Sequence, residues 1–272
     1  MKKVIAALDN SAAAATVLAT AQKLGSVFGA EIDAVHVGED GDRIAAAAAA
    51  AAGLELRRLE GDVVPALAGA AAKEDAVVLV VGARGLPSGR ELGSTALEVI
   101  TSQPKPVVVV PPDAERPGRL ERVLVPLEGT PLTSLAPKTL IQLADDAQIE
   151  VVVLHVHDEA TLPLFTDQPQ HEADAWREEF VARYCPWGIG SVRVDVRVGR
   201  REEEILRAAA EAKADLIAIG WAQKLAAGRA PIVHELLERG RTPVLLIPLR
   251  LPSQRQSRAR RSSWISLQSS PA

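Results

Sequence analysis

A glycine-rich segment carries the residues best suited to bind an anion. It follows the apolar run VVLVV and reads GARGLPSGRELGST over residues 82–95. Glycines let backbone amides approach oxygen atoms, and Ser94 and Thr95 would add hydroxyl donors where a helix begins. The positive end of that helix and the charges of Arg84 and Arg90 would attract the same anion. The segment is therefore either a phosphate site or a turn whose glycines adopt positive φ.

A second candidate group stands at the end of the first predicted strand. Asp9 follows the run VIAAL, and open α/β sheets bind ligands at the carboxyl ends of such strands. Helix capping by Asp9, Asn10 or Ser11 is the alternative, and the two roles are compatible. Neither GxxxxGK[ST] nor a GxGxxG after the first strand occurs, so we expect no Walker A loop.

Cysteine and histidine give little support for other chemistry. The one cysteine, Cys185, is typical of a small buried hydrophobe rather than of a catalytic thiol. The five histidines show no metal-ligand spacing, so we expect no metal site built from protein side chains.

The chain repeats itself at domain length. Residues 4–37 and 123–156 align without a gap, 119 positions apart. A repeat this long predicts two whole domains, which we place at 1–112 and 119–250. A disordered basic tail is expected at 253–272, because it is rich in Ser, Gln and Arg and lacks acids. This tail is either a solvated terminus or an arm that contacts a partner.

Each domain alternates short apolar runs with helical segments. Strands are predicted at 4–8, 31–37, 54–59, 77–81 and 107–110, and in the second copy at 123–127, 150–156, 191–198, 215–219 and 244–247. Helices between them predict right-handed crossovers and parallel sheets. The apolar last strands would be exposed edges, so we expect the two domains to pack together there as a pseudo-symmetric pair.

The second domain carries an insertion after its second strand. There the offset between the copies grows from 119 to 138 positions. Trp176, Phe180 and Tyr184 recur in the insertion at four-residue spacing, which predicts one helix face packed on the sheet. An aromatic ligand box is the alternative.

Charge and hydropathy restrict the partners and the location. Four of the 31 basic residues lie in the tail, so residues 1–252 carry 27 basic against 35 acidic side chains. This acidic body argues against nucleic acid as a partner. The first apolar run ends at Asp9 and the alanine run at 45–52 is too short to span a bilayer, so we expect a cytoplasmic protein with no membrane span.

These motifs together resemble the universal stress protein family. The resemblance rests on LDNS at 8–11, HV at 36–37, and a Gly82-x2-Gly85 pair followed by Gly93-Ser94, and it covers about residues 2–250. It implies an α/β fold of two tandem open parallel five-stranded sheets, in strand order 3-2-1-4-5. The implied class is adenine nucleotide alpha hydrolase-like, with helices on both faces and the last strands of paired domains at the interface.

The resemblance also implies a ligand and the residues that hold it. In ATP-binding members, the residues that match Asp9 and Val37 contact the adenosine part. The ribose and phosphates are surrounded by the residues that match Gly82, Arg84, Gly85, Gly93, Ser94 and Thr95. ATP or another adenine nucleotide is thus expected in the first domain, with Mg²⁺ accompanying the phosphates.

Two departures from the family pattern modify this expectation. The family loop has nine residues between its second and third glycines, whereas residues 86–92 give seven and predict a tighter turn. In the second domain, Gln223 replaces the second glycine, Ala230-Pro231 replaces Gly-Ser, and Glu128 replaces the aspartate. We therefore expect the second domain to hold no nucleotide.

Three functions are compatible with this pattern. The leading one is a tandem stress-response or regulatory module that binds adenine nucleotide in its first domain. The alternatives are a scaffold without nucleotide that recruits an unknown protein partner, and a weak hydrolase with at most slow ATP hydrolysis. Glu91 is the only acid within the loop that could serve such catalysis. The chain would form an intramolecular pseudo-dimer, or a homodimer of tandem chains.

Overall fold

The structure, a computed structural model, describes most of the chain. The described residues are 1–38, 41–84, 92–114, 118–127, 147–157, 169–184, 192–221, 223 and 230–249. Several sequence predictions fall outside them, namely those on Gly85, Arg90, Glu91, Glu128, Cys185 and the tail at 253–272.

Strands and helices alternate along both halves of the chain, as predicted. The first half contains β1 (Lys3–Ala7), α1 (Ala14–Phe28), β2 (Glu31–Val37), α2 (Arg43–Ala51), β3 (Leu56–Leu59), α3 (Val63–Ala72), β4 (Ala76–Gly82), α4 (Ser94–Ser102) and β5 (Val107–Val110). The second half contains β6 (Arg122–Leu127), β7 (Glu150–His157), α6 (Pro169–Tyr184), β8 (Val192–Val198), α7 (Arg201–Glu211), β9 (Leu216–Trp221), α8 (Ala230–Arg239) and β10 (Val244–Pro248).

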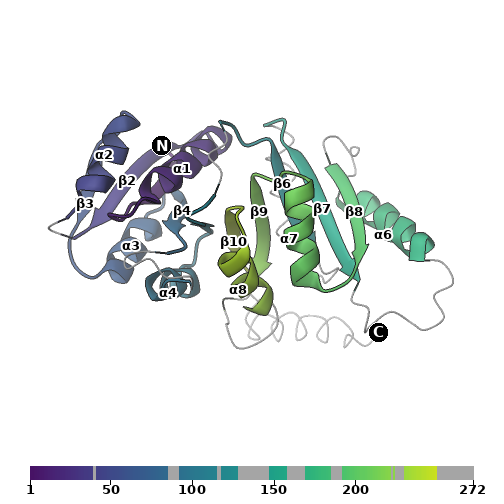
Figure 1. The fold of residues 1–272 in the computed structure, drawn as a ribbon. Helices are drawn as coiled ribbons and strands as arrows, with labels where there is room; N and C mark the ends of the chain where they lie inside the picture. Colours follow the sequence, from purple (N-terminus) through teal and green to yellow (C-terminus); the bar gives the residue numbers. More distant parts are fainter. Residues whose placement is uncertain are drawn as a thin grey trace, which may run out of the picture.

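The described strands form one sheet, and its two halves lie side by side in Figure 1. The strand order is β3-β2-β1-β4-β5-β10-β9-β6-β7-β8, so each half is parallel and keeps the predicted 3-2-1-4-5 order. The two expected sheets are thus joined into one through antiparallel pairing of β5 with β10, with Val109 opposite Val244. This junction confirms the predicted meeting of the last strands. It buries two edges that carry no charged side chain and would otherwise offer free backbone groups.

Helices cover both faces of the sheet. Successive residues of β5 alternate between two cores, with Val108 and Val110 in one and Val107 and Val109 in the other. The first core packs against α1, α2 and Phe180 of α6, and the second packs against α3, α4, α7 and α8. Burial on both faces explains why these strands read as continuous apolar runs.

Two of the three aromatic residues predicted to pack on the sheet, Trp176 and Phe180, do so. Trp176 and Phe180 lie on one face of α6 with ring centroids 5.5 Å apart, and Phe180 is 3% exposed. Trp176 also stacks on His155 of β7 at 4.5 Å. The side chain of Tyr184 lies outside the described part of the structure. Among the described helices, none is long and apolar enough to cross a membrane.

Candidate functional site

The main pocket lies at the carboxyl ends of β1, β2 and β4, and has a volume of about 520 Å³. Every predicted site residue that the structure describes lines it: Asp9, Val37, Gly82, Arg84, Gly93, Ser94 and Thr95. Gly85 is the one predicted member outside the described residues. The topology brings these residues together because β1 and β4 are neighbours whose crossovers leave on opposite faces of the sheet.

Asp9 is held in place by the residue two positions later. Its Oδ1 accepts hydrogen bonds from the Ser11 backbone amide at 3.2 Å and from the Ser11 hydroxyl at 2.6 Å. The helix α1 begins at Ala14, and the Ser11 hydroxyl accepts a hydrogen bond at 3.2 Å from the amide of Ala13, the residue just before it. Ser11 therefore satisfies a backbone amide at the entry to the helix, whereas Asp9 bonds Ser11. No described residue donates to Asp9 Oδ2, which leaves that oxygen for a ligand hydroxyl.

Two further pocket residues were not among the predicted site residues. His36 Nδ1 lies 2.7 Å from the carbonyl oxygen of Leu8 and, in the tautomer that donates, ties β2 to the end of β1. Asn10 Oδ1 accepts a hydrogen bond from the Ile44 amide at 2.7 Å and holds the start of α2. The sequence does contain a signal for His36, because His-Val ends the second strand of both copies.

The beginning of α4 forms the polar end of the pocket. Gly93 precedes the helix with φ −62° and ψ 138°, and no side chain caps the helix. The Gly93 amide donates to the Ala83 carbonyl at 3.0 Å, which closes the base of the shortened loop. Amides in the first turn of a helix lack intrahelical acceptors and sit at the positive end of its dipole. This end of the pocket therefore suits an anionic group.

The conformations of Gly82 and Gly93 do not support the simple turn interpretation. Neither glycine adopts positive φ. A Cβ on Gly82 would meet its nearest atoms at ordinary distances, 3.5 Å from the Arg84 carbonyl oxygen and 3.7 Å from Val17. Backbone geometry therefore does not demand glycine at these two positions.

Arg84 lies between the pocket and the second half. Its Nη2 donates to the backbone carbonyl of Glu238 at 2.9 Å. Its Nε is buried and has no hydrogen-bond partner among the described residues. A guanidinium has five N–H donors, so Arg84 can hold Glu238 and still bind an anion.

The rest of the pocket wall is apolar. It is formed by Val35, Val37, Leu67, Val81 and Val99. An apolar wall facing a cationic, amide-rich end suits a ligand with a flat ring at one end and negative charge at the other. Among the described residues, no group of three or more His, Cys, Asp or Glu side chains could hold a metal ion.

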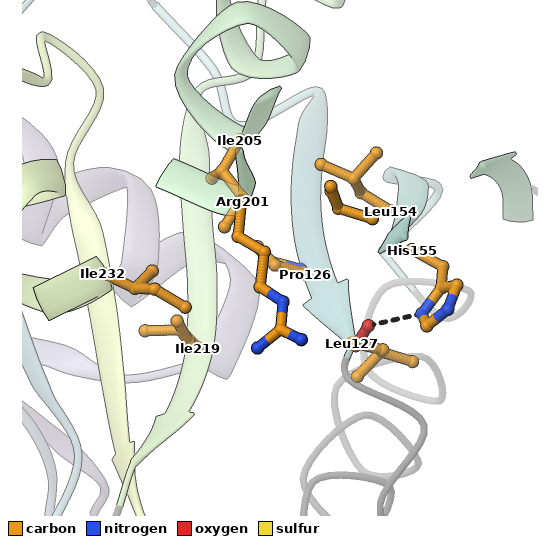
Figure 2. Close-up of a pocket in the computed structure, with 9 residues that line it drawn as sticks. Pro126, Leu127, Leu154, His155, Arg201, Ile205, Ile219 and Ile232 are labelled. Carbon is orange, nitrogen blue, oxygen red and sulfur yellow. Dashed lines mark hydrogen bonds between the residues drawn. The ribbon is translucent and has the colours of Figure 1, made fainter. Parts of the chain in front are cut away.

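The corresponding position in the second half holds a much smaller cavity, of about 50 Å³ (Figure 2). By the offset of 138 positions, Arg201 stands where the first half has Val63. Because Ala230-Pro231 matches Gly93-Ser94, Ile232 stands where the first half has Thr95. Figure 2 shows the Arg201 side chain running between Ile219 and Leu127 into this space. The supporting bond is retained, with His155 Nδ1 2.9 Å from the Leu127 carbonyl. The scaffold is thus preserved, while the space is largely filled by side chains.

Gln223 stands where the family pattern has its second glycine. It adopts φ +57°, a left-handed conformation that is unfavourable for residues other than glycine. Its side-chain amide donates to the backbone carbonyl of Gln103, the residue that follows α4 in the first half. Gln223 therefore contacts the first half.

The family model described as Universal stress protein family matches residues 38–111 and 119–248. The chain belongs to this family.

Among solved structures, a universal stress protein from Archaeoglobus fulgidus DSM 4304 is 19% identical, with a TM-score of 0.64, and the match covers 91% of this chain and 98% of that one. A protein of Pseudomonas aeruginosa UCBPP-PA14 assigned to the same family is 13% identical, with coverage of 91% and 93% and a TM-score of 0.67. Both matches span the two halves, so this universal stress protein shares its tandem fold with them. No curated protein matches the chain.

Proposed function

We propose that the protein is a tandem universal stress protein that acts as a stress-response or regulatory module. In this proposal its domains are residues 1–112 and 119–250, and the first binds ATP or a related adenine nucleotide. The observation that carries the proposal is that all described members of the predicted site line one pocket, of about 520 Å³. The apolar wall would take the adenine ring, and Asp9 Oδ2 would accept a hydrogen bond from a ribose hydroxyl.

The phosphates would lie at the start of α4. The free amides of its first turn, the hydroxyls of Ser94 and Thr95, and the guanidinium of Arg84 are the donors on this side. Mg²⁺ would be held by the phosphate oxygens, because the described chain offers no cluster of carboxylates and histidines for it. The metal would neutralise phosphate charge.

Isothermal titration calorimetry with ATP, ADP and AMP, each with and without Mg²⁺, tests the proposal. We expect one nucleotide per chain, since the second cavity measures only about 50 Å³. Mass spectrometry of the gently purified protein should also reveal a bound adenine nucleotide. If none of the three produces heat and none co-purifies, the chain functions as a scaffold for a protein partner instead. Release of phosphate from ATP over hours would favour the weak hydrolase.

A further inference from the structure

Arg84 touches the candidate pocket and the second half at the same time. It lines the pocket and donates through Nη2 to the carbonyl of Glu238 at 2.9 Å. Glu238 lies in the last turn of α8, where carbonyls lack intrahelical donors and the helix dipole is negative. A guanidinium is well suited to that position. The contact joins residues 154 positions apart in the sequence.

The Arg84 guanidinium has hydrogen-bonding capacity left for a ligand. Its Nε–H is buried without an acceptor among the described residues. Nε has almost no accessible surface, so a ligand in the pocket would reach another N–H of the same guanidinium. An anionic oxygen is the strongest acceptor for such a donor, and its bond would fix the guanidinium plane while Nη2 stays on Glu238.

The helix α8 extends this contact into the second half. Leu236 and Leu237, next to Glu238, are 0% and 1% exposed and belong to a core that includes strands from both halves. At the other end of the same helix, Ile232 lines the small second cavity. One short, well-packed helix thus runs from the residue that holds Arg84 to the cavity of the second half.

We propose that the second half senses ligand in the first pocket through Arg84 and α8. This inference rests on the proposed binding of an adenine nucleotide. An anionic ligand completes the hydrogen bonding of Arg84 and so tightens the last turn of α8 against the first half. Because such coupling is reciprocal, firm docking of α8 in turn raises the affinity of the first pocket.

Hydrogen exchange and calorimetry, run in parallel on the full chain, test this coupling. The probe is ATP at a concentration that saturates the protein, and the readout is amide exchange of residues 230–239. We expect ATP to slow this exchange in the unmodified protein by roughly fivefold or more. Arg84→Lys keeps the charge, but its single ammonium group cannot bridge the same two acceptors, so ATP should leave exchange of α8 unchanged. Arg239→Lys is the matched control on α8, because Arg239 is exposed and pairs with Glu235, one turn earlier on the same helix.

The outcomes separate the two proposals. Heat of binding without slower exchange in residues 230–239 overturns the coupling and leaves nucleotide binding intact. A slowing that persists in Arg84→Lys also overturns it. No heat in the unmodified protein overturns the proposed function, and the coupling with it. If Arg84→Lys binds no ATP, the test compares amide exchange of α8 in the two proteins without ligand. We expect the amides of α8 to exchange faster in the variant than in the unmodified protein. Equal rates would overturn the role of Arg84.

Discussion

The side-chain amide of Gln223 donates a hydrogen bond to the backbone carbonyl of Gln103, across the junction between the two halves. Gln223 makes this contact from a left-handed backbone conformation, φ +57°. A residue other than glycine in this conformation is strained, and here the strain coincides with a hydrogen bond that glycine could not make. This pairing and the Arg84 contact each join the loop after an inner strand of one half to the end of the last helix in the other.

The strain and the hydrogen bond at Gln223 can be separated by two substitutions. Gln223→Ala keeps the strain and loses the bond, whereas Gln223→Gly loses both. We expect the alanine variant to unfold with a free energy about 1 kcal/mol below that of the glycine variant, and the glycine variant to stay close to the unmodified protein. Urea unfolding measures both. Equal stability of the two variants would show that φ at this position carries no strain.

Asp9 and Gly85 should control nucleotide affinity in different ways. Asp9→Ala removes the carboxylate proposed for the ribose and should weaken ATP binding by roughly tenfold, or about 1–2 kcal/mol. Gly85→Gln copies the second loop and should abolish binding, because a side chain would stand where amides approach the phosphates. Calorimetry provides both values, and circular dichroism checks the fold. Glu128→Ala and Gln223→Gly are the matched changes in the second half, and neither should change the number of nucleotides bound per chain. A change in that number would contradict a single site in the first half.

The second half suggests how to close the first pocket. Val63→Arg with Thr95→Ile transfers the two side chains that fill the smaller cavity. Val63 is 41% exposed at the start of α3, so the arginine can be accommodated without unfolding. We expect ATP binding to be lost while the melting temperature changes by only a few degrees. Retained affinity in this double variant would place the nucleotide elsewhere. The reverse pair, Arg201→Val with Ile232→Thr, should leave first-site affinity unchanged.

Acid should destabilise the second half through His155. Burial lowers the pKa of the His155 imidazole, an effect that its hydrogen bond to the Leu127 carbonyl opposes and that nearby His157 and Arg201 reinforce. The folded state therefore binds a proton less readily than the unfolded chain. The stabilising contribution is complete above the ordinary pKa of 6.5 and is lost as the pH falls through the lower folded value.

His155→Phe should reduce this pH dependence, because phenylalanine can stack on Trp176 without titrating. Unfolding by urea at pH 7.5 and pH 5.5 measures the difference in stability for each protein. The loss of stability on acidification should be smaller in the variant than in the unmodified protein. An equal loss in both proteins would mean that another group governs the acid response.

The strands and the pocket could be predicted because each depends on a local pattern. Runs such as VVVV at 107–110 are buried on both faces, and the same property predicted the pairing of β5 with β10. Asp9 and the glycines end their strands at one edge of the sheet, so topology alone brings them together. The start of α1 depends on local contacts instead, because Ser11 bonds Asp9 and the Ala13 amide before the helix begins at Ala14.

Other features depend on contacts that no local pattern encodes. The bond from Arg84 to Glu238 joins residues 154 positions apart, and its acceptor is a backbone carbonyl that any residue type would supply. The positive φ of Gln223 could not be predicted from the sequence either, because glutamine has no preference for a left-handed backbone. Arg201 and Ile232 could have been found by extending the repeat to the later helices, where they replace Val63 and Thr95.

The pairing of β5 with β10 within one chain has a consequence for how the two pockets vary. In an assembly of two identical subunits, any substitution that closes one pocket closes both, and dilution or subunit exchange can take the assembly apart. Here both edge strands belong to one polypeptide, so the roomy pocket and the filled one accompany each other at every concentration. A mutation can therefore change the pocket of one half while the sequence of the other half stays the same.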